Sequence, residues 1–472
     1  MTRFVSIDQG TTSTRSLVVE ADGTSRIAKS ITHRQIYPQP GWVEHDGEEL
    51  LAHVIACLEA AGPAAAIGLS NQGESCLAWD ALTGKPLSPV IVWQDDRTAA
   101  VIERLRAEGR APVVLARAGL PLDPYFSAAK FRWILDHLPE AARALEESRL
   151  RLGTTDSYFL QHLTGHFATD VSTASRTSLM NLATGQWDAD LCALFGVPIH
   201  CLAEIRPTVG DFGSGPTGPI TAAMVDQQAA LHGHGCRVPG DLKITFGTGA
   251  FCLAIAQGTP DPAKLPDGLL PTVAWQIGEQ TTYALDGGVY DVGSAIEWAQ
   301  KSGLAKDLGD FQSFDRPPAI SRELVFVPAF SGLACPYWDR SAAPLLIGLS
   351  HASDIEDIRQ AMLEGIALLT CDVMAAMGRE VAIGGTISID GGVSRNAYFC
   401  QFLADASGRT IAVSEMDEIT AFGAAQLAAV GVGTTLSLPP GTAAKTYQPR
   451  DVPRADWIAR FHDAVGRTRS WK

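Results

Sequence analysis

The chain has 472 residues, 46% of them hydrophobic and 19% charged, and its formal net charge is −15. This length exceeds the size at which a single hydrophobic core stops growing, so we predict two domains, at residues 1–235 and 236–472. The acidic balance argues against nucleic acid or an anionic membrane as the main partner, and no apolar run is long enough to predict membrane insertion.

The first predicted element is a β-hairpin whose turn is suited to an anion. An apolar run at residues 4–7 leads into Asp8, then Gly10 and a group of hydroxyl residues, and a second strand follows at 16–19. Such a turn aims several backbone N–H groups at one point, as phosphate sites do. The adjacent carboxylate suits Mg²⁺, which keeps most of its waters. Taken alone, an ordinary polar hairpin turn is the alternative.

Strand-like and helical periods then alternate, which predicts an α/β architecture. Residues 48–58 show one apolar helical face, and a buried strand at 66–70 delivers Asn71-Gln72-Gly73-Glu74 at its carboxyl end. Ligands bind at that end of the strands in open α/β sheets. Further along, Ser127 is predicted to cap a helix that ends at Pro139.

The second half of the chain echoes the first. An apolar run at 220–225 ends in Asp226, which begins a helix, and a strand at 243–246 leads through Gly247-Thr248-Gly249 into another at 250–253. Two such hairpins indicate an old duplication, with the two turns facing each other across a cleft. After a helix at about 355–374, a strand at 386–390 ends in Gly391-Gly392, and this predicts a nucleotide-sized notch, with a structural turn as the alternative.

Several motifs are absent or weak. No G-x-x-x-x-G-K-[ST] sequence occurs, which excludes a P-loop, and the lack of G-x-G-x-x-G after the first strand weakens a dehydrogenase interpretation. His232, His234 and Cys236 alternate with glycines, which favours a hinge over a zinc site because no second ligand cluster accompanies them. The nine cysteines form no Cys-x-x-Cys pair, so we expect reduced thiols and a cytoplasmic location.

At this point the motifs identify the chain as resembling the FGGY carbohydrate kinases, and most closely their glycerol-phosphorylating members. The match runs nearly end to end. It rests on Asp8-Gln9-Gly10-Thr11-Thr12, Pro40-Gly41-Trp42-Val43-Glu44-His45-Asp46, Ile91-Val92-Trp93-Gln94, Asp123-Pro124-Tyr125-Phe126-Ser127, Ala174-Ser175-Arg176-Thr177, Asp226-Gln227-Gln228-Ala229-Ala230, Gly247-Thr248-Gly249, Pro336-Tyr337-Trp338-Asp339 and Asp390-Gly391-Gly392. The resemblance implies two actin-like, ribonuclease-H-like domains that close on ATP and a polyol.

The resemblance also implies residue roles. Asp226 would be the base that accepts the proton of the substrate hydroxyl, and Asp8 would orient the hydration shell of Mg²⁺. The polyol site would be formed by Glu74, Trp93, Tyr125, Phe251, Asp226 and Gln227. The phosphates and the nucleotide would be held by hydroxyl, glycine and polar residues, namely Thr11, Thr12, Ser13, Arg15, Thr248, Gly249, Gly293, Gly392 and Asn396.

The implied reaction is the ATP-dependent phosphorylation of a terminal hydroxyl of a small polyol, from glycerol to glycerol 3-phosphate. The chain departs from the glycerol-phosphorylating members in having Gly73 in place of a substrate-gripping arginine, Asp95 and Asp96 after Trp93, and Glu297 in place of a glutamine. Because Gly73 removes both charge and volume, a C4–C5 polyol or a keto-sugar is the alternative substrate.

The sequence leaves open whether Asp95 or Asp96 faces the pocket and whether the chain forms a homodimer. Two further alternatives are an actin-like ATPase without a small-molecule substrate and an inactive homologue. Actin-like ATPases of the first kind lack a base of the Asp226 type beside aromatic residues, and this chain has both. The second would have lost one of Asp8, Glu74 and Asp226, and all three are present.

Overall fold

The N-terminal half is organised by a six-stranded sheet with the order β13-β14-β5-β1-β2-β3 in a computed structural model that describes residues 2–471 except 267, 438–444 and 470. Strands β1, β2 and β3 are antiparallel, whereas β5 runs parallel to β1 and β14 parallel to β5. The strands are β1 (Arg3–Gln9), β2 (Ser13–Glu20), β3 (Ser25–Thr32), β5 (Ala66–Asn71), β13 (Ser214–Gly215) and β14 (Gly218–Val225).

The C-terminal half repeats this plan in a seven-stranded sheet with the order β17-β18-β16-β15-β21-β22-β23. Strands β15, β16 and β18 are antiparallel, and β21 and β22 continue in parallel from β15. The strands are β15 (Leu242–Phe246), β16 (Ala250–Ile255), β17 (Leu270–Ile277), β18 (Gln280–Val289), β21 (Thr386–Gly391), β22 (Thr410–Val413) and β23 (Lys445–Tyr447). The orders β3-β2-β1-β5-β14 and β18-β16-β15-β21-β22 match in direction strand for strand. The predicted α/β fold with two ribonuclease-H-like halves is therefore confirmed.

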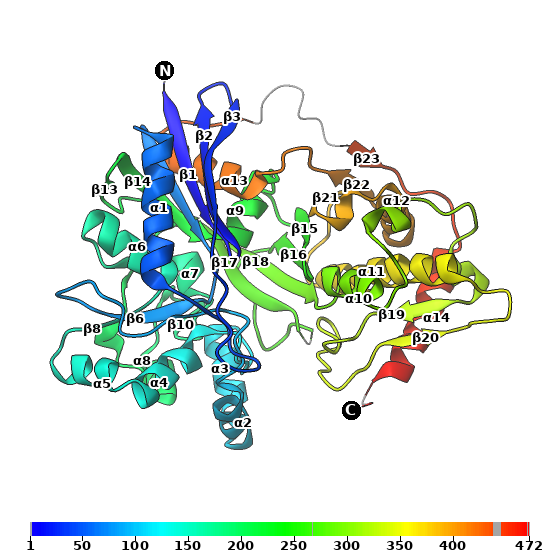
Figure 1. The fold of residues 1–472 in the computed structure, drawn as a ribbon, viewed down its shortest axis with the longest axis horizontal. Coiled ribbons are helices and arrows are strands. Elements are labelled where there is room, and N and C mark those ends of the chain that lie inside the picture. The colour runs from blue at the N-terminus through cyan, green and yellow to red at the C-terminus, as the bar shows by residue number, and fades with distance from the viewer. Residues whose placement is uncertain (1, 267, 438–444, 470, 472) are drawn as a thin grey trace.

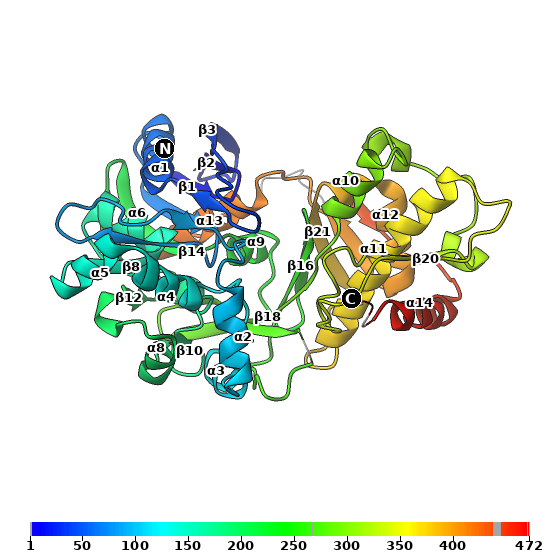
Figure 2. The ribbon, with the colours of Figure 1, turned by 60° about the horizontal axis from the view of Figure 1, so that its bottom comes forward.

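Helices cover both sheets, and smaller elements extend each half (Figures 1 and 2). In the N-terminal half, a four-stranded sheet and its helices lie at one end of the main sheet. Besides the main sheet, this half contains α1 (Gly47–Ala61), α2 (Ala99–Ala107), α3 (Ala111–Ala118), α4 (Ser127–His137), α5 (Pro139–Glu146), α6 (Thr155–Thr164), α7 (Val171–Ala174), α8 (Ala189–Phe195), α9 (Asp226–Gly233), the four-stranded sheet of β4 (Glu44–His45), β7 (Val90–Ile91), β6 (Cys76–Asp80) and β8 (Leu150–Thr154), and the two-stranded sheets of β9 (Ala168–Asp170) with β12 (Glu204–Arg206) and of β10 (Met180–Asn181) with β11 (Gln186–Trp187).

The C-terminal half is completed by β19 (Val325–Val327), β20 (Leu345–Ile347), α10 (Gly293–Lys301), α11 (Ile355–Met377), α12 (Ala397–Ser407), α13 (Ile419–Gly431) and α14 (Arg454–Thr468). Among the described helices, only α11 is long and apolar enough to cross a membrane. Its most apolar window is 94% buried within the protein, as expected for a core helix. The amphipathic pattern at 355–374 thus belongs to the largest hydrophobic core, which includes Met362, Ile366 and Val373.

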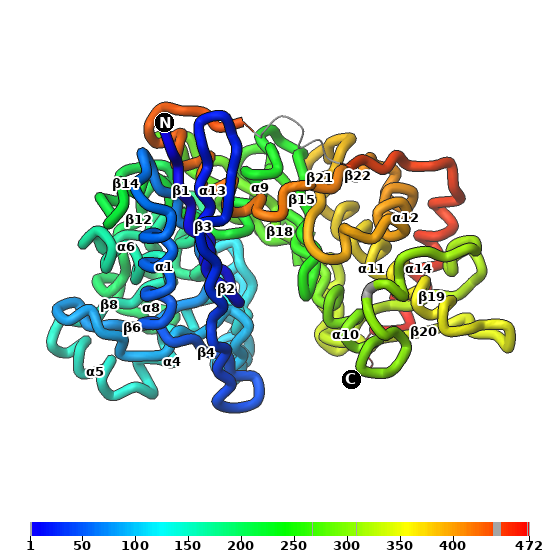
Figure 3. The backbone as a smooth tube through the Cα atoms, turned by 45° about the horizontal axis from the view of Figure 1, so that its top comes forward, coloured from blue at the N-terminus to red at the C-terminus, as the bar shows by residue number. Residues whose placement is uncertain are grey.

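The two halves interlock at α13 and β17. Helix α13, drawn in orange, lies beside the blue strands of the N-terminal sheet (Figures 1 and 3). Its Phe422 and Leu427 share one core with Phe4 and Met224. Strand β17 reaches across in the other direction, since Val273 packs against Val171. The predicted boundary after residue 235 stays a prediction, and the chain on either side of it packs into both halves.

One local prediction is wrong. Ser127 is the first residue of α4 and not its N-cap, which is Phe126 in an extended conformation. The Ser127 hydroxyl donates instead to the backbone oxygen of Glu74 at 2.8 Å. The predicted cap is therefore a contact that fixes a candidate site residue, and Pro139 starts the next helix, α5, where its missing N–H costs no hydrogen bond.

Candidate active site

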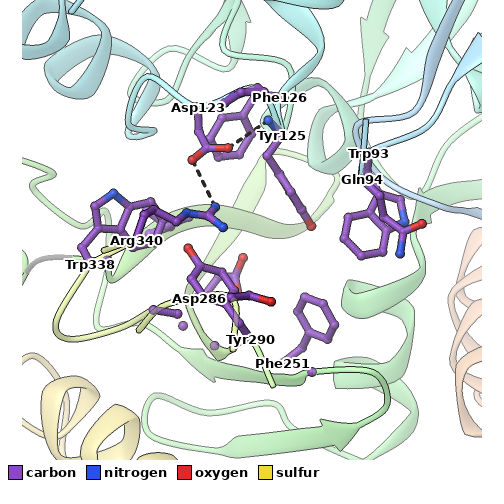
Figure 4. Close-up of a pocket in the computed structure, with 18 of the residues that line it drawn as sticks. Trp93, Gln94, Asp123, Tyr125, Phe126, Phe251, Asp286, Tyr290, Trp338 and Arg340 are labelled. Carbon is purple, nitrogen blue, oxygen red and sulfur yellow. Dashed lines mark hydrogen bonds and ion pairs between the residues drawn. The ribbon is translucent and has the colours of Figure 1, made fainter. Parts of the chain in front are cut away.

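A cavity of about 610 Å³ lies between the two halves and is lined by residues of both (Figure 4). The N-terminal half contributes Trp93, Asp123, Tyr125, Phe126 and Arg176, and the C-terminal half contributes Thr248, Gly249, Phe251, Asp286, Tyr290, Trp338 and Arg340. At one side of the cavity, Arg340 of the C-terminal half pairs with Asp123 of the N-terminal half at 3.4 Å and stacks on Tyr290.

The three predicted aromatic residues meet at this cavity. The Trp93 ring lies 5.4 Å from the Tyr125 ring and 6.4 Å from the Phe251 ring, both in edge-on orientations. The Trp93 indole N–H donates to the Thr11 hydroxyl at 2.9 Å, which ties the aromatic wall to the first hairpin turn. The buried Lys130 ammonium donates to the backbone oxygens of Trp93 and Tyr125, at 3.3 and 2.6 Å, and so holds two loops in place.

Asp226 lies at the junction where β14 ends and α9 begins, as the sequence predicts. Its pKa is raised to about 7, mainly by burial and then by the Asp8 and Glu74 carboxylates, and the Lys243 ammonium opposes this rise. A carboxylate with a pKa near neutrality is well matched to general-base catalysis at physiological pH. This environment supports the predicted role of Asp226.

Gln227 is oriented by a lysine that the sequence did not single out. The Lys243 ammonium is fully buried and donates to the Gln227 side-chain oxygen at 2.5 Å and to the Thr245 hydroxyl at 3.0 Å. Burial lowers the Lys243 pKa, and nearby carboxylates including Asp226 oppose this. Because the amide oxygen is taken, the Gln227 amide nitrogen is the group that remains to donate to a substrate hydroxyl.

Glu74 is buried and its backbone is in the left-handed region, with φ of 60°. A non-glycine residue in this conformation is strained, and such strain gathers at functional sites. The carboxylate accepts from Arg176 Nε at 2.6 Å. Burial raises the Glu74 pKa, and the Arg176 guanidinium opposes this rise. The sequence analysis named Arg176 only as part of the Ala-Ser-Arg-Thr motif and predicted no role for it. Its partners Glu74 and Asp286 lie far away along the chain.

The first hairpin turn forms between β1 and β2, with the Gly10 N–H donating to the Ser13 carbonyl at 3.0 Å. Arg15 is held in place by Glu418, which accepts from one guanidinium nitrogen with both oxygens, at 2.9 and 2.8 Å. Another Arg15 nitrogen donates to the Ser13 hydroxyl at 3.0 Å. The structure thus pairs Arg15 with a carboxylate, and its contact with phosphate stays a prediction, as do those of Thr11, Thr12 and Ser13.

The second turn, Gly247-Thr248-Gly249, is closed by a hydrogen bond from the Gly247 N–H to the Gly249 carbonyl at 2.8 Å. Helix α10 begins directly over it, since a Cβ on Gly293 would come within 2.8 Å of the Gly247 oxygen. The close approach explains the glycine at 293. Backbone N–H groups of a turn next to a helix N-terminus are suited to anions.

The two glycines at the end of β21 differ in their surroundings. Gly391 has φ of 93° and no room for a Cβ beside the Phe246 backbone, whereas a Cβ on Gly392 would point into open space. Gly392 is thus free of steric neighbours, as a nucleotide-lining position requires. The Asn396 side chain caps α12 by accepting from the Phe399 N–H, and its amide donates to the Phe311 carbonyl. These bonds give Asn396 a structural role, and its predicted nucleotide contact stays a prediction.

Asp8 is the carboxylate predicted to orient the hydration shell of the metal ion, and its charge raises the pKa of Asp226. Burial raises the Asp8 pKa to about 6, and the Arg15 guanidinium and a hydrogen bond from Ser70 only partly offset this. The ionised Asp8 carboxylate therefore lacks a full counter-charge, and a bound cation would supply it. No group of three or more metal-ligating side chains occurs among the described residues. A single carboxylate beside phosphates is nevertheless the usual protein contribution to a Mg²⁺ site, so Asp8 fits the ion.

The two acids after Trp93 differ. Both contribute to the lining of the cavity, but the Asp95 side chain is buried and accepts from the Val43 N–H and from Arg97, so its carboxylate stabilises its own loop. Asp96 is exposed beside Gly41. Glu297, which departs from the expected glutamine, is an exposed residue of α10. Within the described part of the chain His232 bonds to Gln426 and His234 pairs with Asp390, and no metal cluster forms there.

Comparisons with known proteins agree with this geometry. The N-terminal and C-terminal domain models of the FGGY family of carbohydrate kinases match residues 3–233 and 242–432. A glycerol kinase from Aromatoleum aromaticum is 39% identical over 495 residues, with 100% of this chain and 99% of that protein covered. One from Rhizorhabdus wittichii is 42% identical over 460 residues, with 92% and 89% covered.

The solved structures give the same result. The crystal structure of Plasmodium falciparum glycerol kinase with ADP is similar with a TM-score of 0.91 and 28% identity, covering 99% of this chain and 98% of that one. A ligand-bound xylulose kinase from Lactobacillus acidophilus shares the fold, with a TM-score of 0.85 at 21% identity, covering 99% and 97%. Since both domain models match in order and together cover most of the sequence, the chain belongs to the FGGY family of carbohydrate kinases.

Proposed function

We propose that this kinase transfers the terminal phosphoryl group of ATP to a terminal hydroxyl of glycerol, forming glycerol 3-phosphate. The observation that carries the proposal is the half-buried Asp226 carboxylate at the start of α9, whose pKa is raised to about 7 and which feels charges from both halves, Asp8 and Glu74 on one side and Lys243 on the other. Similarity to glycerol kinases over nearly the whole chain supports glycerol as the acceptor. The aromatic residues Trp93, Tyr125 and Phe251 suit a short carbon chain.

The proposed reaction follows from these residues. The substrate hydroxyl gives its proton to the Asp226 carboxylate while its oxygen bonds to the terminal phosphorus of ATP, and the bond from that phosphorus to ADP breaks. The Gln227 amide nitrogen, oriented by Lys243, donates to the neighbouring hydroxyl, and the Glu74 carboxylate accepts from that same hydroxyl. The turns at Thr11–Ser13 and Thr248–Gly249 provide N–H and hydroxyl donors for phosphate oxygens.

Mg²⁺, when bound with the nucleotide, would neutralise charge on the phosphate oxygens. Asp8 would hold the hydration shell of the ion, because its own carboxylate lacks a full counter-charge. A side chain at Gly293 would clash with the Gly247 oxygen, whereas the space beside Gly392 is open. Without side chains, both residues would let the nucleotide approach the backbone. Asn396 would act there through its position at the start of α12.

The alternative substrates are C4–C5 polyols and keto-sugars, which the replacement of an arginine by Gly73 suggested. A Cβ on Gly73 would point at Val225, 3.0 Å from its nearest methyl, so the space beside Gly73 is largely filled by that side chain. This favours glycerol. The test is an ADP-release assay across C3 to C6 polyols and ketoses. Glycerol should have the highest kcat/KM, and a C4 or C5 compound that outperforms it would favour the alternative.

A cytoplasmic location and a homodimer belong to the same proposal. All nine cysteines are buried and none forms a disulfide in the described structure, which suits a reducing compartment. Multi-angle light scattering on the purified chain tests the oligomeric state, and a monomer at micromolar concentration would contradict the dimer.

A further inference from the structure

The Arg176 guanidinium has one donor group with no protein partner. Its Nε donates to Glu74 Oε1 at 2.6 Å, and its Nη2 pairs with Asp286 Oδ2 at 3.1 Å. The third nitrogen, Nη1, is buried and donates to no partner among the described residues. Only 5% of the side chain is exposed. Buried charged donors are rarely left unpaired, because they lose hydration without gaining a hydrogen bond.

The surroundings of Arg176 point to a ligand at the unpaired nitrogen. Both Arg176 and Asp286 line the large cavity between the two halves. The guanidinium carbon lies 5.5 Å from the ring centre of Phe126 and 6.0 Å from that of Tyr125, so apolar surface flanks it on the N-terminal side. Asp286 comes from β18 of the C-terminal half and is labelled in Figure 4. The pair therefore offers a donor and an acceptor to one small polar group, from opposite halves of the protein.

The position of this pair relative to the base follows from their shared neighbour. Glu74 contacts Arg176 directly, and it is also one of the carboxylates that raise the Asp226 pKa. Arg176 is not among the main charges that act on Asp226, whose principal cationic neighbour is Lys243. Glu74 is thus in direct contact with Arg176 and close enough to Asp226 to act on its pKa. A polyol whose reacting hydroxyl is at Asp226 would extend past Glu74 toward Arg176.

Gly73, next to Glu74, supplies no charged donor, and its missing side chain would have pointed at Val225. A donor for the far end of the substrate must come from elsewhere in the site. We propose that Arg176 and Asp286 bind the hydroxyl farthest from the one that is phosphorylated. Arg176 Nη1 donates a hydrogen bond to that oxygen, and the Asp286 carboxylate accepts a hydrogen bond from the same O–H. This inference rests on the proposed function and names the residues that select a polyol with a hydroxyl at both ends.

The test compares glycerol with 1,2-propanediol, which lacks one terminal hydroxyl, and with 1,3-propanediol, which lacks the middle one. The variant Arg176→Lys keeps a cation for Glu74 but loses the forked guanidinium. For the wild type we expect kcat/KM on 1,2-propanediol to be about ten- to a hundredfold below that on glycerol, the effect of one hydrogen bond to a charged group. In Arg176→Lys this preference should shrink toward one.

The preference of glycerol over 1,3-propanediol is the internal control and should be unchanged in the variant, because other residues bind the middle hydroxyl. Asp286→Asn, which keeps the shape of the side chain, should also reduce the preference over 1,2-propanediol, and it provides a second readout if Arg176→Lys folds poorly. An equal loss on all three substrates in both variants would show a purely structural role and overturn the inference. Absence of glycerol phosphorylation by the wild type would overturn the proposed function itself.

Discussion

Asp226 carries most of the proposed chemistry, and its environment allows a direct test. Asp226→Asn keeps the shape of the side chain but removes the proton acceptor, so kcat should fall by roughly 10²–10⁴-fold with ATP affinity little changed. Steady-state kinetics and nucleotide titration measure the two quantities. Near-normal turnover on glycerol would contradict the role of base.

A stability measurement on Asp226→Asn distinguishes loss of the base from unfolding as the cause of the lower kcat. The folded-state pKa of about 7 is above the usual value of 3.8, so the folded protein binds this proton more tightly than the unfolded chain does. The ionised carboxylate therefore costs stability, and the cost grows as pH rises from about 4 through 7. We expect Asp226→Asn to melt at a higher temperature than the wild type at pH 8 and at a similar one near pH 4.

The pH dependence of the reaction gives a further prediction, at Lys243. Only the ionised Asp226 accepts a proton, so kcat/KM of the wild type should rise with pH and level off above about 7. Lys243→Met removes the cation that favours the carboxylate, so the rising limb should move to higher pH. Lys130→Met is the matched control, because it also removes a buried ammonium but one that acts on Glu74 and Cys76. A limb that stays in place in Lys243→Met, or moves equally in both variants, would contradict this assignment.

The sequence predicts the acidic residues of the site better than the basic ones. Asp8, Glu74 and Asp226 lie at or just after the ends of strands, and that position made each a candidate. Arg176 and Lys243 were not assigned roles, because their partners come from other elements and pairing between them is invisible in a local pattern. A weak signal exists for Lys243, which is the second residue of the mostly apolar strand β15 and is fully buried there.

At the level of elements, the hairpins and the strand-to-helix junctions follow from local sequence, but the position of α13 does not. Its face against α9 and β5 consists of small residues, so no amphipathic pattern marks its partner. A Cβ on Gly423 would lie 1.9 Å from the Ala229 backbone oxygen, and one on Gly68 would lie 2.3 Å from that of Ala424. The contact depends on backbones approaching closely, which only the folded chain reveals.

This close packing predicts that Gly423→Ala destabilises the protein although alanine favours helices. The added methyl must push α13 away from α9, which overpacks the core at a cost of about 1–3 kcal/mol. Gly466→Ala is the matched control, since Gly466 is an exposed residue inside α14 with nothing near its Cβ position, and the change should stabilise by about 0.5–1 kcal/mol. Urea unfolding measures both. A stabilising Gly423→Ala would contradict the crossing of α13 and α9.

For the whole molecule, the arrangement of the two halves around the cavity predicts closure on ligands. The cavity walls come from both halves, and the contacts that join the halves include two ion pairs, Arg340 with Asp123 and Arg15 with Glu418. Exposed pairs such as the first contribute at most about 1 kcal/mol and can exchange partners without a large cost. Glu418 also holds a guanidinium that a phosphate could take over.

Closure is required chemically as well, because water left in the cavity would compete with the substrate hydroxyl for the phosphoryl group. We therefore expect small-angle scattering to show a smaller radius of gyration when glycerol and a non-hydrolysable ATP analogue are added together. Glycerol alone should have a smaller effect, since it does not engage both phosphate turns. Adding both ligands to Asp226→Asn should still compact the protein, because that variant keeps the shape of the site. Identical scattering with and without both ligands, at concentrations where binding is confirmed by titration, would show that the halves are already in their working arrangement.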